Sequence, residues 1–234
     1  MTTPVCAVIG VGPGNGAAIS RRFAGEGYAV ALVARTADVS ARLAEELGAP
    51  ARAYQADASD PTSLEQVLAA IRRDLGEIDV LVYNAGSGVW GTVEEIGADE
   101  FEASWRVNAL GAFVASQQVI PAMKRKGQGS IVLIGATASR RGGPKSTAFS
   151  SAKGAQRSLA ESMARHLWPA GIHVSVVVID GVVDLPRARE RMPDKPDGFF
   201  VRPDDVAATV SWIVRQPRST WSFEVEARPS GESW

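Results

Sequence analysis

The 234-residue sequence contains a single cysteine, Cys6, so no disulfide can form within the chain. Cys6 stands in an apolar run, where we expect a small buried side chain, and such sparse cysteine usage is typical of a reducing compartment. A strong charge of either sign is also lacking, because the formal net charge is −1. The sequence therefore gives no electrostatic reason to expect nucleic acid or an anionic membrane as a partner.

Long apolar runs are absent as well. No stretch approaches the roughly 20 apolar residues that a membrane-spanning helix needs, and an apolar run begins at Val5, too early for a signal peptide. Internal repeats and low-complexity segments are not found either. With 45% hydrophobic residues the chain can still bury a continuous core. We therefore expect a cytoplasmic protein.

Apolar strand-like runs alternate with helix-like runs along the whole chain. The pattern predicts an α/β fold, a doubly wound parallel sheet of about seven strands with helices on both faces, in one domain covering residues 1–234. Strands are expected at 5–9, 29–33, 51–56, 79–83, 130–134, 173–179 and 221–227. Helices are expected at 17–24, 39–47, 64–75, 99–126, 147–167 and 204–214.

Local signals refine this outline. Thr62 or Ser63 is expected to cap the helix at 64–75, and Pro121 is expected to bend the helix at 99–126. Residues 135–146, rich in Gly, Ser, Thr and Arg, should form a loop. Residues 185–202 contain three prolines and predict a mobile flap rather than a core element.

The first strand runs directly into a turn with three glycines, Gly10, Gly14 and Gly16, and a helix follows at once. Glycine has no Cβ, so the backbone of such a turn can approach a bulky ligand closely. The first turn of the helix offers unpaired N–H groups and the positive end of its dipole, which favour phosphate. A turn without a ligand would look similar in isolation. Its place between two strands of a βαβ unit favours dinucleotide binding.

Six signals occur in one order along the chain: Gly10-x-x-x-Gly14-x-Gly16, Asp57, Asn84-Ala85-Gly86, Asn108, Lys153 and Gly181-Val182-Val183. In this register the sequence resembles the short-chain dehydrogenase/reductase family along essentially its whole length. The resemblance implies a single Rossmann domain with a nicotinamide dinucleotide across the carboxyl ends of the strands. It also implies a homodimer or homotetramer formed through the helices around 102–123 and 147–167. The last residues, 224–229, depart from the family's usual ending, which puts tetramer contacts in doubt.

The resemblance assigns the cofactor-binding residues one by one. The pyrophosphate turn would contain Gly10, Gly14, Asn15 and Gly16, and the adenine would lie beside Asp57 and Ala58. The adenosine ribose side would be lined by Asn84, Ala85 and Gly86. Lys153 and the backbone of Val183 would hold the nicotinamide end. Two positions depart from the family pattern. Ile9 stands where Thr is usual, and Tyr83 stands where the family has the first Asn of its motif.

Arg35, at the end of the second expected strand, indicates which cofactor is bound. Members that bind NAD normally carry Asp or Glu there, to bond the ribose 2′-hydroxyl. A guanidinium can instead hold a 2′-phosphate. An exposed surface arginine is the alternative interpretation, and the second basic residue often found in the turn is replaced by Pro13. We expect NADP(H), with NAD(H) left open, and no metal.

The family's two catalytic hydroxyls are missing. Its Tyr-x-x-x-Lys motif is Phe149-Ser150-Ser151-Ala152-Lys153 here, and its Ser position falls on Ala136. A phenyl ring has no proton to donate, and a positioned general acid contributes about 10²–10⁴ in rate. The remaining candidates for catalytic roles are Lys153, which would hold the ribose, Asn108, which would hold a water or a carbonyl, and Asp180. Asp180 would either accept backbone N–H bonds in its own turn, or relay a proton or stabilise a cation.

Three functions are compatible with this site. The first is an NADP(H)-dependent oxidoreductase that transfers a hydride to or from a small, partly apolar substrate, a carbonyl, an imine or an activated alkene, with an altered proton donor. The second is a cofactor-binding protein without turnover, and the third is non-redox chemistry on the same scaffold. The apolar part of the substrate is suggested by Met192, Phe199 and Phe200 in the flap, although plain packing would explain them equally well.

Overall fold

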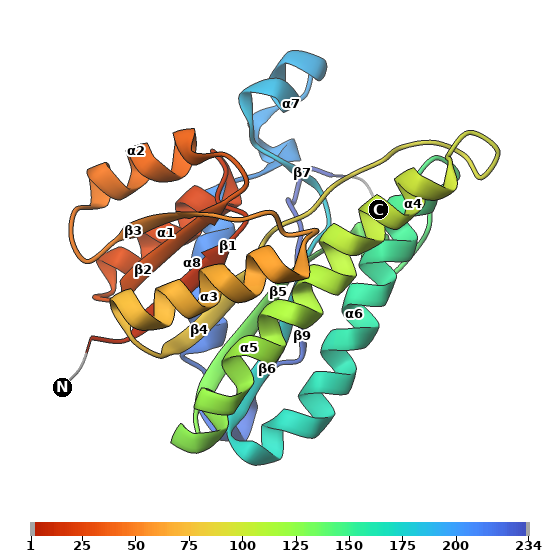
Figure 1. Ribbon diagram of the computed structural model, residues 1–234. Helices are drawn as coiled ribbons and strands as arrows, with labels where there is room; N and C mark the ends of the chain where they lie inside the picture. The colour runs from red at the N-terminus through yellow and green to blue at the C-terminus, as the bar shows by residue number, and fades with distance from the viewer. Residues whose placement is uncertain (1–2, 233–234) are drawn as a thin grey trace.

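The computed structural model describes residues 3–232 and shows an α/β fold with a central parallel sheet (Figure 1). Within this range the sheet has seven strands in the order β3-β2-β1-β4-β5-β6-β9, which confirms the doubly wound sheet expected from the sequence. The strands are β1 (Val5–Ile9), β2 (Ala29–Ala34), β3 (Arg52–Gln55), β4 (Ile78–Tyr83), β5 (Gly129–Ala136), β6 (Ile172–Ile179) and β9 (Glu224–Ala227). Because all pairings are parallel, the carboxyl ends of the strands meet at one edge.

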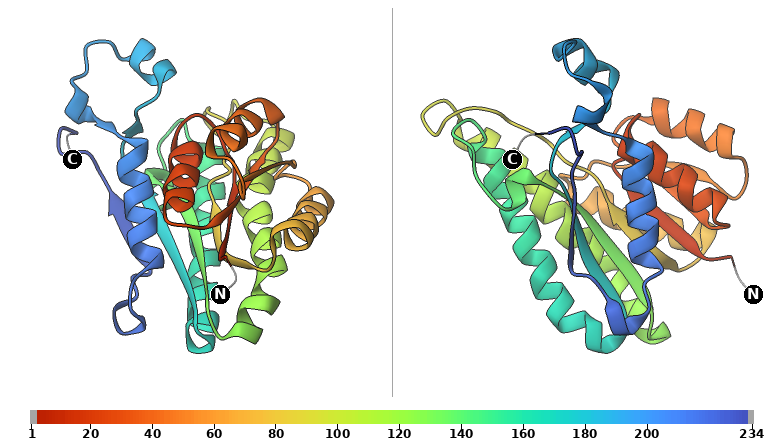
Figure 2. Two further views of the ribbon diagram at one scale, coloured as in Figure 1. Left: turned by 90° about the vertical axis from the view of Figure 1, so that its left-hand side faces the viewer. Right: turned by 180° about the vertical axis from the view of Figure 1, so that it is seen from behind.

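Helices cover both faces of the sheet, as the side view in Figure 2 shows. One face packs against α1 (Asn15–Gly25), α2 (Ala37–Leu47) and α8 (Pro203–Val214), and the other against α3 (Pro61–Leu75), α5 (Gly111–Lys126) and α6 (Thr147–Leu167). Successive residues of β1 alternate between the two cores: Val5, Ala7 and Ile9 enter one, and Cys6 and Val8 the other. A strand buried on both faces therefore reads as an unbroken apolar run.

The start of α3 differs from the expectation. Neither Thr62 nor Ser63 caps this helix; the cap is Asp60, whose carboxylate accepts the backbone N–H of Thr62 at 3.0 Å. Pro61 then occupies the first helical position, where its missing N–H costs nothing. The Ser63 hydroxyl instead accepts the N–H of Asp57 at 3.1 Å. The helix consequently begins three residues earlier than the apolar periodicity alone indicated.

The helix expected at 99–126 is interrupted. It consists of α4 (Ala98–Trp105), a π-helical turn at Arg106–Leu110 and α5, and it continues through Pro121 to its end. The phenol of Tyr83, fully buried at the end of β4, donates to the carbonyl of Val107 inside the π turn. Gly111 follows directly, and a Cβ on it would overlap both the Tyr83 hydroxyl and the Ala58 carbonyl. Widened turns of this kind often occur at functional sites.

The segment expected as a flap contains regular structure. It forms α7 (Pro186–Arg191), a single 3₁₀ turn (Asp197–Phe199) and β8 (Phe200–Val201), which pairs with β7 (Val182–Val183). Phe200 and Val201 are buried, so part of this segment belongs to the packed interior after all. The α7 helix itself projects from the body of the molecule (Figures 1 and 2).

Arg189 holds the projecting segment together. Its guanidinium makes two hydrogen bonds to Asp184, at 2.7 and 2.8 Å, and one to Asp197 at 2.7 Å. The same group lies over the ring of Phe200, 4.1 Å from its centroid. These contacts tie both ends of the segment to one side chain, while the mobility expected from its prolines stays a prediction.

The contact between Gly111, Tyr83 and Ala58 can be tested with alanine. An added methyl group at Gly111 must push neighbours apart, so we expect Gly111→Ala to lower the free energy of unfolding by about 1–3 kcal/mol in urea denaturation. Gly154 in α6 is the matched control, because a Cβ there meets no described atom within 4 Å. Gly154→Ala should stabilise by about 0.4–1 kcal/mol. Equal effects of the two changes would contradict the proposed close fit.

Candidate active site

The glycine turn joins the end of β1 to α1 and packs directly against the end of β4. Gly10 has a φ of +95°, and a Cβ on it would overlap the backbone of Ala85. The Asn84 side-chain amide donates to the carbonyl of Gly10 at 2.7 Å. A Cβ on Gly16 would lie 2.6 Å from the same carbonyl oxygen. These three contacts explain why small residues are needed where the two strand ends meet.

The same turn has features that fit a dinucleotide. A Cβ placed on Gly12 would meet no described atom within 4 Å, so the outer side of the turn is open. The side-chain oxygen of Asn15 is buried and has no hydrogen-bond partner among the described residues, which leaves an acceptor for a ligand hydroxyl. Leu185, at the base of the projecting segment, lies over the turn, 2.8 Å from where a Cβ of Gly14 would be. The flap and the turn thus face each other.

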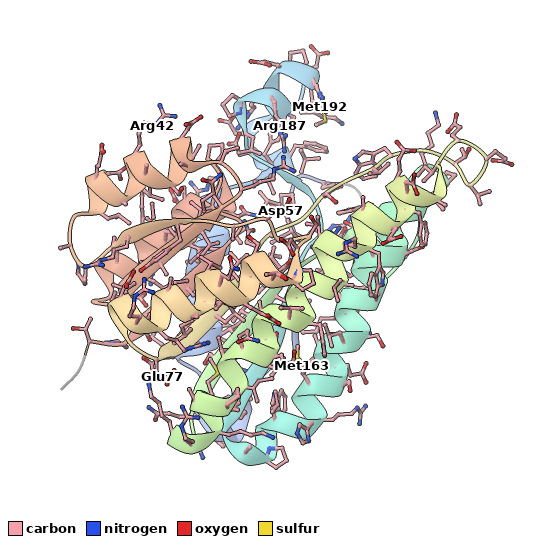
Figure 3. All side chains as sticks on the ribbon, in the orientation of Figure 1. Arg42, Asp57, Glu77, Met163, Arg187 and Met192 are labelled. Carbon is pink, nitrogen blue, oxygen red and sulfur yellow. The ribbon has the colours of Figure 1, made fainter. Side chains whose placement is uncertain are left out.

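Arg35 and Asp57 follow neighbouring strands at the carboxyl edge of the sheet (Figure 3 labels Asp57). Arg35 is exposed, and its carbonyl accepts the Gln55 side-chain amide at 3.1 Å. The Asp57 carboxylate accepts the backbone N–H of Ser59 at 2.8 Å and its hydroxyl at 2.7 Å. These hydrogen bonds, with a smaller effect of the Arg35 charge, lower the pKa of Asp57 below its usual value. Ala58 lies next to it, against the helix at Gly111.

Lys153 extends from α6 into the interior below the carboxyl edge. Its ammonium donates to the carbonyl of Ile134 at 2.7 Å and to the Gln156 side-chain oxygen at 3.1 Å. Burial lowers the pKa of Lys153 from 10.5 to about 7. Gln156 is itself buried, and its amide donates to the backbone carbonyl of Asn108 at 2.9 Å. Gln156 therefore connects the lysine to the π turn.

Asn108 lies in the π turn and is fully buried. Its side-chain nitrogen donates to the carbonyls of Ser104 and Ser87, at 2.8 and 3.0 Å. Its side-chain oxygen has no partner among the described residues. A Cβ on the exposed Gly86 would lie 3.2 Å from this oxygen and 3.7 Å from the Lys153 nitrogen. An unused acceptor and an ammonium thus border the same surface position.

Phe149 stands one helical turn before Lys153 on α6 and is half-buried. Its ring packs against that of Trp90, with centroids 5.3 Å apart and planes tilted by 44°. Ala136 ends β5, and its N–H donates to the hydroxyl of Ser139 at 3.0 Å. The two positions that the sequence singled out thus present an aromatic ring and a methyl group, and Trp90 adds a second ring beside Phe149.

Asp180 lies at the end of β6 and is buried. Its carboxylate accepts the hydroxyl of Thr137 and the guanidinium of Arg228, the latter at 2.6 Å, and Arg141 lies 3.6 Å away. The expected alternative, acceptance of N–H bonds from its own turn, is not observed among the described residues. Asp180 borders a hollow of about 260 Å³ lined by Thr137, Arg140, Arg141, Asp180 and Glu226.

The structure brings most of the sequence-derived residues to one edge. Val183, in β7, pairs with Val201 and begins the segment that covers the glycine turn. Sequence reasoning missed Gln156, although its place three residues after Lys153 puts both on one helix face. It also missed Trp90, which only its size and exposure mark. Across residues 3–232, no helix is long and apolar enough to cross a membrane, and no acidic, His or Cys cluster is arranged for a metal.

The pH dependence of stability should report the buried state of Lys153. Between about pH 7 and 10.5 the unfolded chain holds a proton on this lysine that the folded chain lacks, so stability should rise with pH across this window. Lys153→Met should remove that rise, as urea denaturation at about pH 6 and about pH 9 would measure. The control is Lys145→Met, because Lys145 is exposed. An unchanged slope in Lys153→Met would show that the ammonium is not buried.

Comparison with known proteins gives consistent results. The family model for short chain dehydrogenases matches residues 4–195. A curated relative from Xanthobacter autotrophicus, described as "Inactive 2-(S)-hydroxypropyl-CoM dehydrogenase 2", is 30% identical over 201 residues, covering 80% of this chain and 87% of its own.

Solved structures agree over nearly the full length. A short-chain dehydrogenase from Rhodopseudomonas palustris is 33% identical with a TM-score of 0.83, covering 97% of this chain and 98% of its own. A metagenomic short-chain oxidoreductase in complex with NADP is 26% identical with a TM-score of 0.84, covering 98% of each chain. Together with the glycine turn, Asn108 and Lys153, these matches show that the chain belongs to the short-chain dehydrogenase/reductase family.

Proposed function

We propose that the protein is an NADP(H)-dependent oxidoreductase that transfers a hydride to or from a small, partly apolar substrate, using a proton route that differs from the family's. The observation that carries this proposal is that a set of polar groups and a pair of aromatic rings lie side by side at the carboxyl edge of the sheet. The Lys153 ammonium and the unused Asn108 oxygen border Gly86 beside the glycine turn. Next to them stand Phe149 and Trp90 in place of polar groups.

The choice of NADP(H) rests on Arg35. Its side chain is exposed at the end of β2, next to Asp57, where the adenosine end of a dinucleotide would lie on the glycine turn. A guanidinium there can form bidentate hydrogen bonds to a 2′-phosphate. The NADP found in the metagenomic relative supports the same assignment. When bound, this cofactor would supply or accept the hydride, while Lys153, Asn108 and the glycine turn would hold it in place.

Within residues 3–232, the donor and oxyanion positions of the substrate half have no hydroxyl, and the unpartnered Ser87 hydroxyl lies buried in the loop after Gly86. Phe149 and Ala136 occupy the proposed donor and oxyanion positions, and the nearby Thr137 hydroxyl already donates to Asp180. Hydride delivery by proximity and orientation can still operate. We therefore include imines and activated alkenes beside carbonyls among the substrates. Of these, an imine that is already protonated as an iminium needs no proton during the transfer, whereas a ketone gains negative charge on oxygen and needs both missing groups.

A second candidate function is cofactor binding without turnover. The same replacements, Phe149 and Ala136, favour it, and one curated relative is itself described as inactive. The homo-oligomer expected from the family also stays a prediction. Exposed aromatic side chains along the α4–α5 helix are compatible with it: Phe101, Trp105 and Phe113.

Calorimetry with NADPH and NADH tests the cofactor. We expect the unmodified protein to bind NADPH more tightly than NADH. Arg35→Ala should lower the affinity for NADPH by about ten- to hundredfold and change the affinity for NADH little, since hydrogen bonds to charged groups contribute about 1.5–3 kcal/mol. Arg42→Ala is the matched control, an exposed arginine on α2 whose side chain donates to the Asp38 carbonyl. Absence of heat with either coenzyme would refute the proposed function.

Restoring the hydroxyls tests the altered proton route and separates the two candidates. The unmodified protein is mixed with NADPH and a panel of ketones, imines and enones while nicotinamide absorbance is followed. We expect ketones to be poor substrates, and Phe149→Tyr with Ala136→Ser to raise ketone reduction by about 10²–10⁴. The single change Ala136→Ser is the control and should gain far less. Silence of the unmodified protein with the whole panel would favour binding without turnover.

A further inference from the structure

Trp90 is a large apolar side chain held at the surface beside the catalytic position. It is 66% exposed, yet its ring packs on Phe149 and lies across its own loop at Gly88, where a Cβ would come within 2.8 Å of the indole nitrogen. The loop is fixed to the start of α6 by a bridge between Gly91 and Ser146, with the N–H of Gly91 donating to the Lys145 carbonyl at 2.9 Å. These contacts fix the position of the indole ring although most of it is exposed.

Several polar groups next to this aromatic pair are engaged within the protein, whereas the buried Ser87 hydroxyl has no partner among the described residues. Lys153 donates to Ile134 and Gln156. The hydroxyls of Ser146 and Ser150 bond to each other at 2.6 Å, and that of Thr137 donates to Asp180. The two positions nearest the rings, Phe149 and Ala136, offer no donor to a carbonyl oxygen that becomes negative during hydride transfer. A substrate that is positive before the transfer and neutral after it has no such need.

Charge on the loop and on the helix that follows it favours a cation. From residue 84 to 105 the sequence has five acidic residues and no lysine, arginine or histidine: Glu94 and Glu95 on the loop, and Asp99, Glu100 and Glu102 on α4. Only Glu102 forms an ion pair among the described residues, with Arg106. Of the basic residues on the facing segment, Arg140 is paired with Glu226, Arg141 lies near Asp180, and Lys145 is exposed. Fields of this sign raise the local concentration of cations.

We propose that Trp90 and Phe149 form a cation–π site for iminium ions, which are the substrate class of this protein. This inference rests on the proposed function for its redox step. The iminium carbon takes up a hydride from the dihydronicotinamide, a C–H bond forms, and the C=N π pair becomes the lone pair of a neutral amine nitrogen. The nicotinamide is left oxidised, and no proton enters or leaves. The ring faces of Trp90 and Phe149 hold the positive charge until transfer.

Binding of a cation that cannot react gives a readout independent of turnover. The probes are N,N-dimethyl tetrahydroisoquinolinium and its neutral planar counterpart, N-methyl dihydroisoquinolinone, both titrated calorimetrically with and without NADPH. We expect the cation to bind more tightly than the lactam. Trp90→Leu should lower the affinity for the cation by about two- to thirtyfold, which corresponds to the range of cation–π energies. Trp90→Phe should keep most of the affinity. Trp212→Leu, an exposed tryptophan on α8, is the control and should change nothing.

Reaction with N-methyl dihydroisoquinolinium completes the test. We expect it to be reduced faster than ketones of similar size, and Trp90→Leu to raise its KM more than it lowers kcat. Equal binding of cation and lactam, or an unchanged cation affinity in Trp90→Leu, would overturn the inference. Turnover of ketones or enones without a preference for the iminium would also overturn it while leaving the proposed function intact. Absence of binding heat with NADPH would instead overturn the proposed function. The affinities for the cation and the lactam would still show whether Trp90 and Phe149 form a cation–π site.

Discussion

A buried ammonium with only uncharged partners organises this site. No carboxylate among the described residues pairs with Lys153; it donates to a carbonyl of β5 and to Gln156, and burial lowers its pKa to about 7. Such a group is costly to bury. The surrounding contacts hold it in one place: Gln156 bonds to the π turn, and the π turn is held by the phenol of Tyr83. Burying this ammonium thus lowers the stability of the fold at a place where hydrogen bonds from a bound ligand would compensate for the cost.

The two sides of the lysine differ in character. On the side of the glycine turn lie the open position Gly12 and two buried acceptors without partners among the described residues, Asn15 and Asn108. On the side of Phe149, Thr137 and Arg228 both donate to Asp180, and the rings of Phe149 and Trp90 pack together. Under the proposed function the first side would hold the cofactor, and the second would recognise a substrate by shape and charge.

Much of the architecture could be predicted because it is local in sequence. The glycine turn, the buried strands and the place of Lys153 one turn after Phe149 all follow from short-range spacing. The π turn could not be predicted in this way, since it depends on a contact between Tyr83 and Val107, 24 residues apart. Gln156 carried a visible signal in its spacing from Lys153, but its second partner, Asn108, is 48 residues away. The cap at Asp60 was missed because several adjacent residues are equally good candidates by type.

The fit of Tyr83 against Gly111 also constrains how this protein can diverge. Because a Cβ at 111 would overlap both the Tyr83 hydroxyl and the Ala58 carbonyl, a shorter side chain at 83 would remove only one of the two obstacles. That shorter side chain would leave the Val107 carbonyl without its donor. A larger residue at 111 therefore requires a shift of the backbone at Ala58 as well as a change at 83, and either substitution alone should cost stability.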